Sequence, residues 1–424
     1  MADDSKGGGS LYGRPDLINA AERSNIDRSM RDRYAGIANG LGILADAVRY
    51  RPKRSDNPQF EMVIATGLIR GTSSPASVAY AGSGANRDWC IGTSIFERND
   101  TEMVRYSSAE ETIAALRRTT KDVDIVFIDD LGENLVADLQ TDFVHIPAWV
   151  KQRVRLESDW PTQIRSLKRG LRQEVSRVIR KYGYECRLAG NAAEISRFYD
   201  QQYRPFVSSL YGRSAIIVDR DRFVRECRRG VLLQLIDHEA VVASALLRPV
   251  GRTMAIVWTG MRPGADCKRI PGATDALDYF SLLYTHLKGY RWLDFGPSRT
   301  DLCDGTLRYK RKWGSELITG HFRQPPIYWT CNGDNNAVRD FLRRHMFISN
   351  RKGQLTCLTF MFDNNDAEML RRTMEHQITP GISEYRVVSL SPVSRALRTD
   401  LNRIHPDINV IETQSVADAM RLAS

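Results

Sequence analysis

The sequence predicts a mixed α/β protein with more than one domain. At 424 residues the chain is longer than a single hydrophobic core usually organises. Short apolar runs typical of strands alternate with amphipathic stretches typical of helices, and in the second half the order changes from hairpins to strand, helix, strand. Hydrophobic residues make up 42% and charged residues 26%, a balance that excludes a disordered or fibrous chain.

The N-terminal third predicts a polar lead followed by a small α/β unit. Residues 1–57 hold a Gly/Ser-rich lead that we expect to be flexible, a helix over residues 26–50, and a proline-containing linker. In residues 58–150 the runs MVIATGLI and DIVFIDDL predict strands on either side of the helical stretch SAEETIAALRRT. Ser108 opens that stretch with Glu111 three residues later, which is the spacing of a capping box.

The middle of the chain, residues 151–365, predicts a second and larger α/β domain. One long helix is expected after Asp159, with apolar residues at three- and four-residue steps and Gly183 as its stop. Three β-rich runs between residues 231 and 260 predict an antiparallel meander. A helix over residues 273–288 and the short strand RWLDF follow.

The C-terminal residues 366–424 predict an appended α/β element. YRVVSL and INVIE are typical of strands, and VSRALRTDLNRI between them is typical of a helix. Just before this element, residues 338–344 predict a helix and residues 353–362 a strand. No motif in the extension indicates its purpose.

The charge of the chain favours anionic partners. A net charge of +10 and a pI near 9.3 suit RNA, phosphorylated cofactors or acidic polysaccharide, although a basic enzyme without such a partner has the same composition. The helix after Asp159 carries a basic surface made of Arg165, Lys168, Arg169, Arg172, Arg177, Arg180 and Lys181. Such a face is usually only solvated, and the alternative is a cradle for a phosphate-bearing substrate.

The sequence predicts a soluble, cytoplasmic protein. No apolar run approaches the ~20 residues that a membrane helix needs. The start MADDSKGGGS is acidic where a secretion signal is basic. Seven scattered cysteines without CxxC spacing suggest neither a disulfide framework nor a zinc site.

Familiar catalytic signatures are mostly absent from the sequence. It has no GxxxxGK[ST] phosphate loop, no HExxH and no GxSxG elbow, and the Gly-rich stretch GSGANR (residues 82–87) fails the dinucleotide pattern and predicts a turn. The seven histidines are well separated, so a local metal cluster is not indicated. We therefore expect no metal and no tightly bound cofactor.

The segment WLDFG…DGTLRYKRKWG (residues 292–314) carries the strongest chemical signal. Asp304 is placed to cap a short helix and Gly314 to end it, directly after a strand end where α/β sheets commonly bind ligands. Thr306, Lys310 and Trp313 fall on one side of this helix, and Tyr309 lies four residues before Trp313. The alternative is a surface helix that Tyr309 and Trp313 merely anchor.

The string DFGPSRTDLCDGTLRYKRKWG resembles the strand-loop-helix signature of the FemAB-like acyltransferases of the GNAT superfamily. That signature is a DFG or similar strand end followed by G-x-x-[RK]-[FY]-K-x-x-[FW]-G. The upstream helix SLKRGLRQEVSRVIRKYGYE resembles the entry helix of the same family. Together these likenesses span residues 159–322, about two-fifths of the chain.

The resemblance implies tandem GNAT-like domains, the first degenerate, with the acyl donor and acceptor meeting in the second. Donors in the family are acyl-thioesters or aminoacyl-tRNA, and acceptors are amines on sugars, peptides or amino acids. It implies that Lys310 stabilises developing negative charge, with Tyr309 as its aromatic partner. RIPGAT (residues 269–274) matches the coenzyme A loop [QR]-x-x-G-x-[GA] only in part, because Thr274 stands where a smaller residue is expected and Pro271 removes one amide donor.

The resemblance implies an N-acyltransferase that uses acyl-CoA or an acyl carrier protein as co-substrate. The alternatives are an aminoacyl-tRNA-dependent transferase and a non-catalytic RNA-binding scaffold. Asp294 or Asp304 is expected to accept the proton that the amine loses. The alternative for each aspartate is a purely structural role. The expected donor-binding residues are Arg269, Gly272, Arg299, Arg308, Lys168, Arg169 and Arg172. The expected substrate-binding residues are Trp313, Trp258, Ser298 and Thr306.

Overall fold

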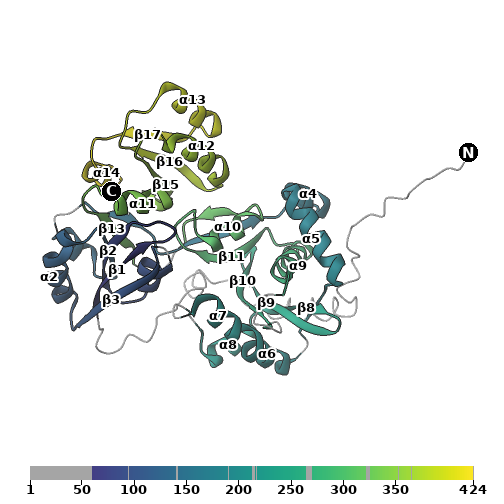
Figure 1. Cartoon of the computed structure of the whole chain (residues 1–424). Helices are drawn as coiled ribbons and strands as arrows, with labels where there is room; N and C mark the ends of the chain where they lie inside the picture. Colours follow the sequence, from purple (N-terminus) through teal and green to yellow (C-terminus); the bar gives the residue numbers. More distant parts are fainter. Residues whose placement is uncertain are drawn as a thin grey trace, which may run out of the picture. The chain divides into compact units, whose positions relative to one another are not determined.

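The computed structural model of the protein is a mixed α/β fold, as predicted (Figure 1). It describes residues 60–93, 95–139, 142–189, 191–212, 215, 217–263, 270–320, 325–351, 353–363 and 365–423. The N-terminal lead, predicted from the sequence to be flexible, and the helix expected over residues 26–50 lie outside the described residues.

The chain divides into two compact units that are discontinuous in sequence. The first contains Val154–Phe295 and Lys312–Gly314, and the second contains the described residues up to Arg153, Gly296–Arg311 and the described residues from Ser315 onwards. The sequence predicted breaks after residues 57, 150 and 365, and these boundaries stay a prediction. The second unit joins distant segments because strand β13 (Ile327–Cys331) pairs with β4 (Ile125–Asp129) and β5 (Val144–Ile146).

The first unit is built on a sheet whose strands run in the order β11-β10-β9-β8-β7. The predicted meander is confirmed, because β9 pairs antiparallel with both β8 and β10. These five strands are part of a seven-stranded sheet, and their bounds are β7 (Glu185–Leu188), β8 (Val231–Asp237), β9 (Ala240–Val250), β10 (Thr253–Met261) and β11 (Trp292–Ser298).

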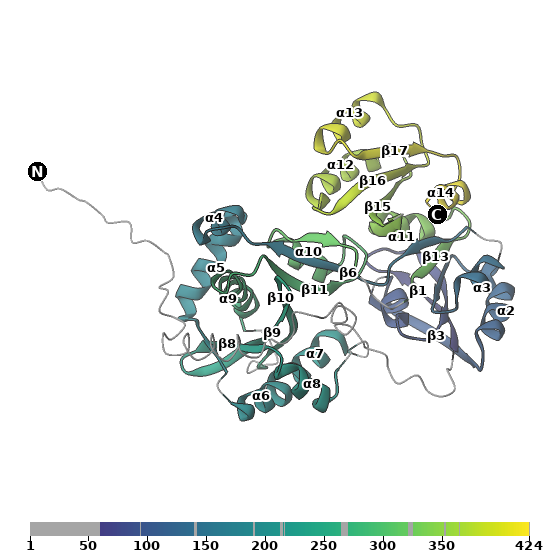
Figure 2. The same cartoon turned by 180° about the vertical axis from the view of Figure 1, so that it is seen from behind.

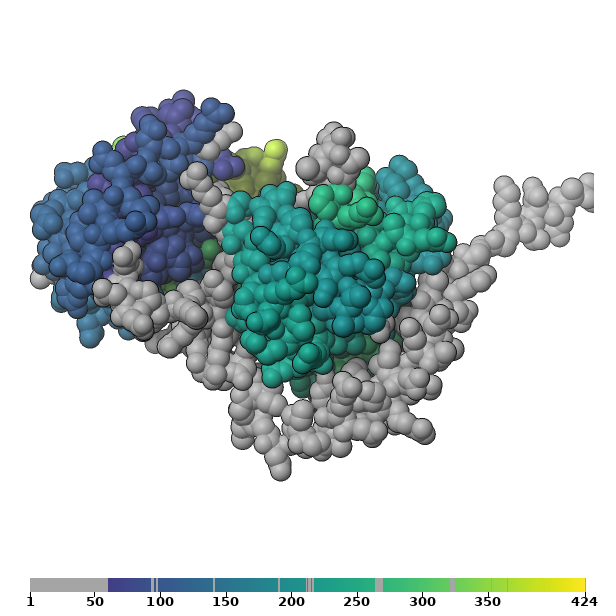
Figure 3. All heavy atoms as spheres, turned by 90° about the horizontal axis from the view of Figure 1, so that it is seen from below, coloured from purple at the N-terminus to yellow at the C-terminus, as the bar shows by residue number. Residues whose placement is uncertain are grey.

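Helices cover both faces of this sheet (Figure 2). Helices α5 and α9 bury apolar side chains such as Val178 and Leu277 against one face, and α6 to α8 bury Phe198 and Phe223 against the other. The helices from α6 to α8 form the teal surface seen from below in Figure 3. The bounds are α5 (Arg169–Tyr182), α6 (Ala192–Phe198), α7 (Arg204–Tyr211), α8 (Arg220–Cys227) and α9 (Ala273–Leu287).

The basic helix expected after Asp159 is two helices in the structure. Asp159 caps α4 (Trp160–Ser166) by accepting a hydrogen bond from the Thr162 N–H. The break follows because Leu167 adopts an extended backbone (ψ 145°) that buries its side chain in the core. Helix α5 then ends at Gly183 in the left-handed conformation, as predicted.

The second unit contains a six-stranded sheet in the order β3-β1-β2-β4-β13-β5. Helices α2 and α3 pack on one face, while α11 and α14 pack on the other. Ser108 caps α2 through the Glu111 N–H, which confirms the predicted cap. The remaining bounds are β1 (Phe60–Ile69), β2 (Pro75–Gly82), β3 (Phe96–Tyr106), α2 (Ala109–Thr119), β4 (Ile125–Asp129), α3 (Glu133–Ala137), β5 (Val144–Ile146), α11 (Asn336–Arg344) and α14 (Val416–Ala423).

A four-stranded sheet, in the order β14-β15-β16-β17, forms the C-terminal part of the second unit. Helices α12 and α13 bury Leu370, Met374 and Leu401 against one of its faces. The predicted strand, helix, strand rhythm of the extension is confirmed in β16, α13 and β17. The bounds are β14 (Phe347–Arg351), β15 (Gln354–Met361), α12 (Asp366–Gln377), β16 (Ile382–Ser389), α13 (Arg395–Ile404) and β17 (Ile408–Glu412).

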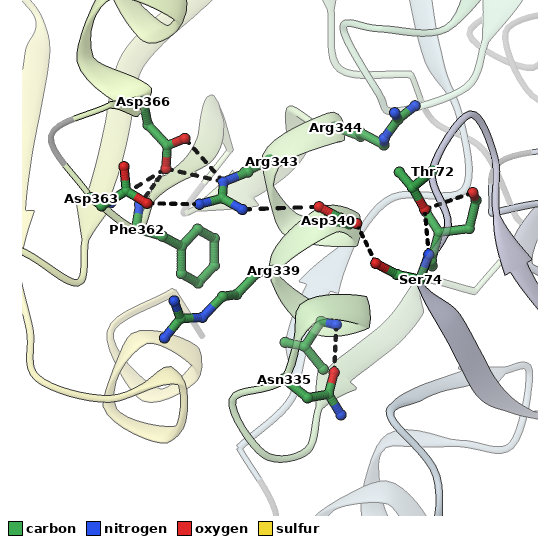
Figure 4. Close-up of polar contacts among 12 residues, drawn as sticks. Thr72, Ser74, Asn335, Arg339, Asp340, Arg343, Arg344, Phe362, Asp363 and Asp366 are labelled. Atoms are coloured by element: carbon green, nitrogen blue, oxygen red, sulfur yellow. Dashed lines mark hydrogen bonds and ion pairs between the residues drawn. The ribbon is translucent and has the colours of Figure 1, made fainter.

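Helix α11 links these two sheets of the second unit through polar contacts (Figure 4). Asp340 accepts a hydrogen bond from the Ser74 hydroxyl at 2.6 Å, next to the hairpin between β1 and β2. On the other side, Arg343 pairs with Asp363 at 3.1 Å and with Asp366 at 3.0 Å at the start of α12. Its guanidinium also lies 5.1 Å from the centre of the Phe362 ring.

Among the helices of the described residues, none combines the length and the hydrophobicity that a membrane span requires.

Candidate functional site

The signature segment forms the end of β11, a loop and the short helix α10 (Gly305–Arg311). Asp304 caps this helix as predicted, since its carboxylate accepts the Leu307 N–H at 2.9 Å. Burial raises the pKa of Asp304 above its ordinary value, although the N–H groups of Leu307 and Thr306 and the charge of Lys310 act in the opposite direction. A carboxyl with a raised pKa holds a proton more readily at moderate pH, which suits a group that accepts one during a reaction.

Lys310 points back along α10 to the end of β11. Its ammonium donates hydrogen bonds to the carbonyl oxygens of Pro297 at 2.7 Å and Gly296 at 3.3 Å. These contacts hold a half-buried positive charge at a strand end, where the sequence predicted it. The backbone of Gly296 has φ +76°, a conformation that favours glycine and helps turn its carbonyl toward the lysine.

A buried glutamine from strand β6 (Val150–Arg155) joins the parts of this segment. Gln152 donates to the Leu307 carbonyl of α10 at 3.2 Å and to the Ser315 hydroxyl at 3.1 Å. It also accepts a hydrogen bond from the Ser298 hydroxyl at 2.6 Å. Ser298, predicted to bind substrate, is therefore engaged inside the protein at 1% exposure. One glutamine on a strand has no local signature, so sequence reasoning missed Gln152.

The side chains that surround the Arg299 guanidinium were not predicted from the sequence. Its guanidinium lies 3.8 Å from the centre of the Trp149 ring and 5.0 Å from that of Trp89, and it donates to the Asn86 side-chain oxygen at 2.6 Å. Asn86 in turn donates to the buried carboxylate of Asp129 at 3.0 Å. Burial lowers the pKa of Arg299 to about 10 despite nearby acidic groups. These contacts anchor the loop between β11 and α10, and the predicted role of Arg299 in holding donor phosphate stays a prediction.

The same loop is fixed by a buried aspartate–histidine contact. The Asp301 carboxylate lies 2.6 Å from Nδ1 of His345, and both side chains are almost fully buried. The same carboxylate accepts the backbone N–H groups of Cys303 at 2.9 Å and Met346 at 3.1 Å. Burial alone would raise the pKa of Asp301, but the charge and hydrogen bond of His345 and these two N–H groups bring it below its ordinary value.

In the first unit, strands β10 and β11 separate partway along their length. They pair in parallel only from Thr253–Trp292 to Ala255–Asp294, although β10 continues to Met261. A bulge between Ile256 and Trp258 bends β10 just beyond this point. Asp294 is buried at 8% exposure at the last paired position.

The two tryptophans predicted to bind substrate, Trp313 and Trp258, stack on phenylalanine side chains of the protein. Trp313 is fully buried in the core of the first unit and stacks on Phe295 with 6.4 Å between ring centres. This corrects its prediction as a substrate contact, because no ring face is exposed. Trp258 is half-buried and stacks on Phe223 at 4.8 Å. Tyr309 and Thr306 are half-buried on α10, where their predicted roles remain predictions.

The predicted donor-binding residues lie in different places. Lys168 and Arg169 are exposed at the start of α5, Arg172 is half-buried one turn later, and Arg308 is exposed on α10. Arg269 lies outside the described residues. Within those residues, no group of three or more histidine, cysteine or acidic side chains is placed to hold a metal ion.

Gly272 serves the packing of α9 on α5. Its backbone has φ +69°, and a Cβ atom there would lie 2.3 Å from Cγ1 of Val178. We expect Gly272→Ala to lower the free energy of unfolding by about 1–3 kcal/mol, because the helices must move apart and the backbone is strained. Urea denaturation measures this loss. Adding Val178→Ala should recover part of it, and losses that simply add would contradict the close contact.

The sequence matches no protein-family model, and no curated protein matches it. Three solved structures illustrate what the chain is similar to. FemX is 12% identical, with 63% of this chain and 83% of that chain covered and a TM-score of 0.33. L-PGS from Bacillus licheniformis is 11% identical, with 66% and 83% covered and a TM-score of 0.31. A tandem GNAT protein from the clavulanic acid biosynthesis pathway is 12% identical, with 54% and 69% covered and a TM-score of 0.28.

Proposed function

We propose that the protein is an N-acyltransferase that moves an acyl group from an acyl-thioester to an amine on a sugar, peptide or amino acid. The observation that carries this proposal is the Lys310 ammonium, held at the end of β11 by the carbonyls of Gly296 and Pro297. Acyl transfer passes through a tetrahedral oxyanion, and a fixed positive charge is what stabilises such an oxygen.

The reaction needs two further groups besides the lysine. The amine nitrogen attacks the acyl carbon, the bond from carbon to sulfur breaks, and the proton lost by the amine must be accepted. Asp304 accepts it in this proposal, directly or through water, since its pKa is raised by burial and it lies near enough to sense the charge of Lys310. Asp294 is the second candidate for that role. Tyr309 is a candidate to protonate the leaving thiolate, with packing as its alternative.

The basic helix α5 is proposed to hold the phosphates of the donor. Guanidinium and ammonium groups bind phosphate oxygens well, and Lys168, Arg169 and Arg172 lie within one turn and a half of each other.

Replacing Lys168, Arg169 and Arg172 together with glutamine should raise the Michaelis constant for the donor about tenfold or more with little change in kcat. The reason is that contacts to a remote part of the donor contribute equally to the ground state and the transition state. Steady-state kinetics with the donor varied measures this. The control is Arg177→Gln on the same helix, whose side chain is paired with Glu174 instead. An unchanged Michaelis constant in the triple variant would remove the helix from donor binding.

An aminoacyl-tRNA donor is the second proposal, favoured by the net charge of +10 and the departures from the coenzyme A loop at Pro271 and Thr274. A non-catalytic RNA scaffold is the third. Purified protein that carries RNA, with affinity that falls steeply in salt, would support either of these. Consumption of an aminoacylated tRNA would distinguish the transferase from the non-catalytic scaffold.

The experiment that tests the leading proposal is a mass-spectrometric comparison of metabolites with and without the active protein. We expect a product heavier than an amine precursor by the mass of one acyl group. The matched control is the Lys310→Ala protein. A product difference that persists with this variant would contradict the assignment.

A further inference from the structure

Helices α4 and α5, with one residue of α9, enclose a pocket that the acyl-transfer chemistry does not explain. Its volume is about 540 Å³, within the range of small-molecule sites. The pocket lies wholly within the first unit. The residues that line it and carry the argument are Trp160, Arg165, Arg169, Arg172, Arg180 and Tyr279.

The charge of this pocket is of one sign. Four arginines and no acidic residue line the pocket, and the structure describes every residue of this lining. Three of these arginines are exposed, while Arg172 is half-buried. The Nε atom of Arg172 is buried and has no hydrogen-bond partner in the described part of the protein. A buried cationic donor without an acceptor is costly, and an anionic oxygen bound in the pocket would satisfy it once the side chain turns to expose Nε.

The pocket lining also contains aromatic and apolar side chains. Trp160 and Tyr279 meet edge to face with 5.6 Å between ring centres, and both are half-buried. Ile164, Leu167 and Val175 add apolar surface. A planar ring stacks favourably on such side chains, and arginine planes can sandwich it from the other side. The chemistry therefore combines a site for a flat ring with a site for phosphate.

We propose that the pocket between α4 and α5 binds a nucleotide, with its base against Trp160 and Tyr279 and its phosphate on Arg172 and Arg169. Arg165 and Arg180 lie on the exposed rim and steer the anion inward. This inference names the class of ligand that the basic helix holds. Its assignment to the acyl donor rests on the proposed function, but binding itself does not.

The test is equilibrium binding of adenosine 5′-monophosphate to the full chain, measured by isothermal titration calorimetry without any acyl donor. We expect binding that weakens at least tenfold in Arg172→Gln and in Trp160→Leu. The Arg177→Gln protein should bind like the wild type, because Arg177 pairs with Glu174 and does not line the pocket. Circular dichroism confirms that each variant is folded.

Two comparison ligands separate the parts of the proposal. Adenosine, which lacks phosphate, and inorganic phosphate, which lacks the ring, should each bind at least tenfold more weakly than the nucleotide. Equal binding of inorganic phosphate would overturn the nucleotide assignment and leave a simple anion site. No binding to the wild type at millimolar nucleotide, or unchanged binding in Arg172→Gln, would overturn the site itself. Nucleotide binding without acyl transfer would uphold this inference while the proposed function fails, and transfer without nucleotide binding would do the reverse.

Discussion

Replacing Lys310 with alanine is expected to slow acyl transfer about 100-fold to 1000-fold, which is the typical loss when one donor to an oxyanion is removed. The side chain is half-buried, and its hydrogen bonds are to the main-chain carbonyls of Gly296 and Pro297. Its removal therefore leaves the fold intact. Single-turnover kinetics with a saturating donor measures the loss in the chemical step, and thermal unfolding measures the fold.

The matched control for this variant is Lys288→Ala. Lys288 lies at the end of α9, with its ammonium 5.8 Å from the centre of the Tyr284 ring, and the proposed chemistry does not use it. Its replacement should leave the rate within about twofold, since a cation–π contact of this kind contributes about 1 kcal/mol to folding and not to the reaction. Transfer by Lys310→Ala at the wild-type rate would rule out the oxyanion role.

Replacing Asp301 with alanine is expected to lower the free energy of unfolding by about 3–5 kcal/mol, as for other broken buried pairs. The change leaves His345 and the backbone N–H groups of Cys303 and Met346 without their buried acceptor. Urea denaturation at pH 7 measures the loss. Asp301→Asn should lose less, because its amide oxygen still accepts a hydrogen bond. Asp142→Ala, which removes a surface pair with Arg421, should cost about 0–1 kcal/mol.

The contribution of Asp301 should also depend on pH in a defined direction. The folded-state pKa of this carboxyl lies below its ordinary value, so the folded protein favours the charged form. The stabilisation is therefore complete above the unfolded pKa of about 3.9 and is lost as the pH falls through the folded pKa. The difference between wild type and Asp301→Ala should shrink below about pH 4. A difference that stays constant down to pH 2 would show that the ionised carboxylate is not what stabilises the loop.

The type of most elements was predictable because local signals determine it. Ser108, Asp159 and Asp304 each cap a helix through an N–H group three residues later, and residues this close in sequence are always close in space. The meander from β8 to β10 followed from short β-rich runs in the same way. The break at Leu167 was missed because burial of that side chain, and not a turn residue, causes it.

Only the part of the candidate site that lies within a few residues of α10 was predictable from the sequence. Lys310 and its cap share one helix, so the sequence placed them together. Arg299 and Trp313 were predicted to contact ligands, but distant residues decide their surroundings: Trp149 and Asn86 enclose Arg299, and the core of the first unit buries Trp313.

The sequence by itself determined a mixed α/β fold, its capped helices, its basic charge and a lysine after the DFG strand end. Only the tertiary structure decided where the units divide, which cations are buried, and that four arginines face the same pocket as Trp160 and Tyr279. The physical reason is the separation along the chain over which each kind of interaction acts. Periodicity and capping act within a few residues, whereas burial and pairing depend on which distant segments the folded chain brings into contact.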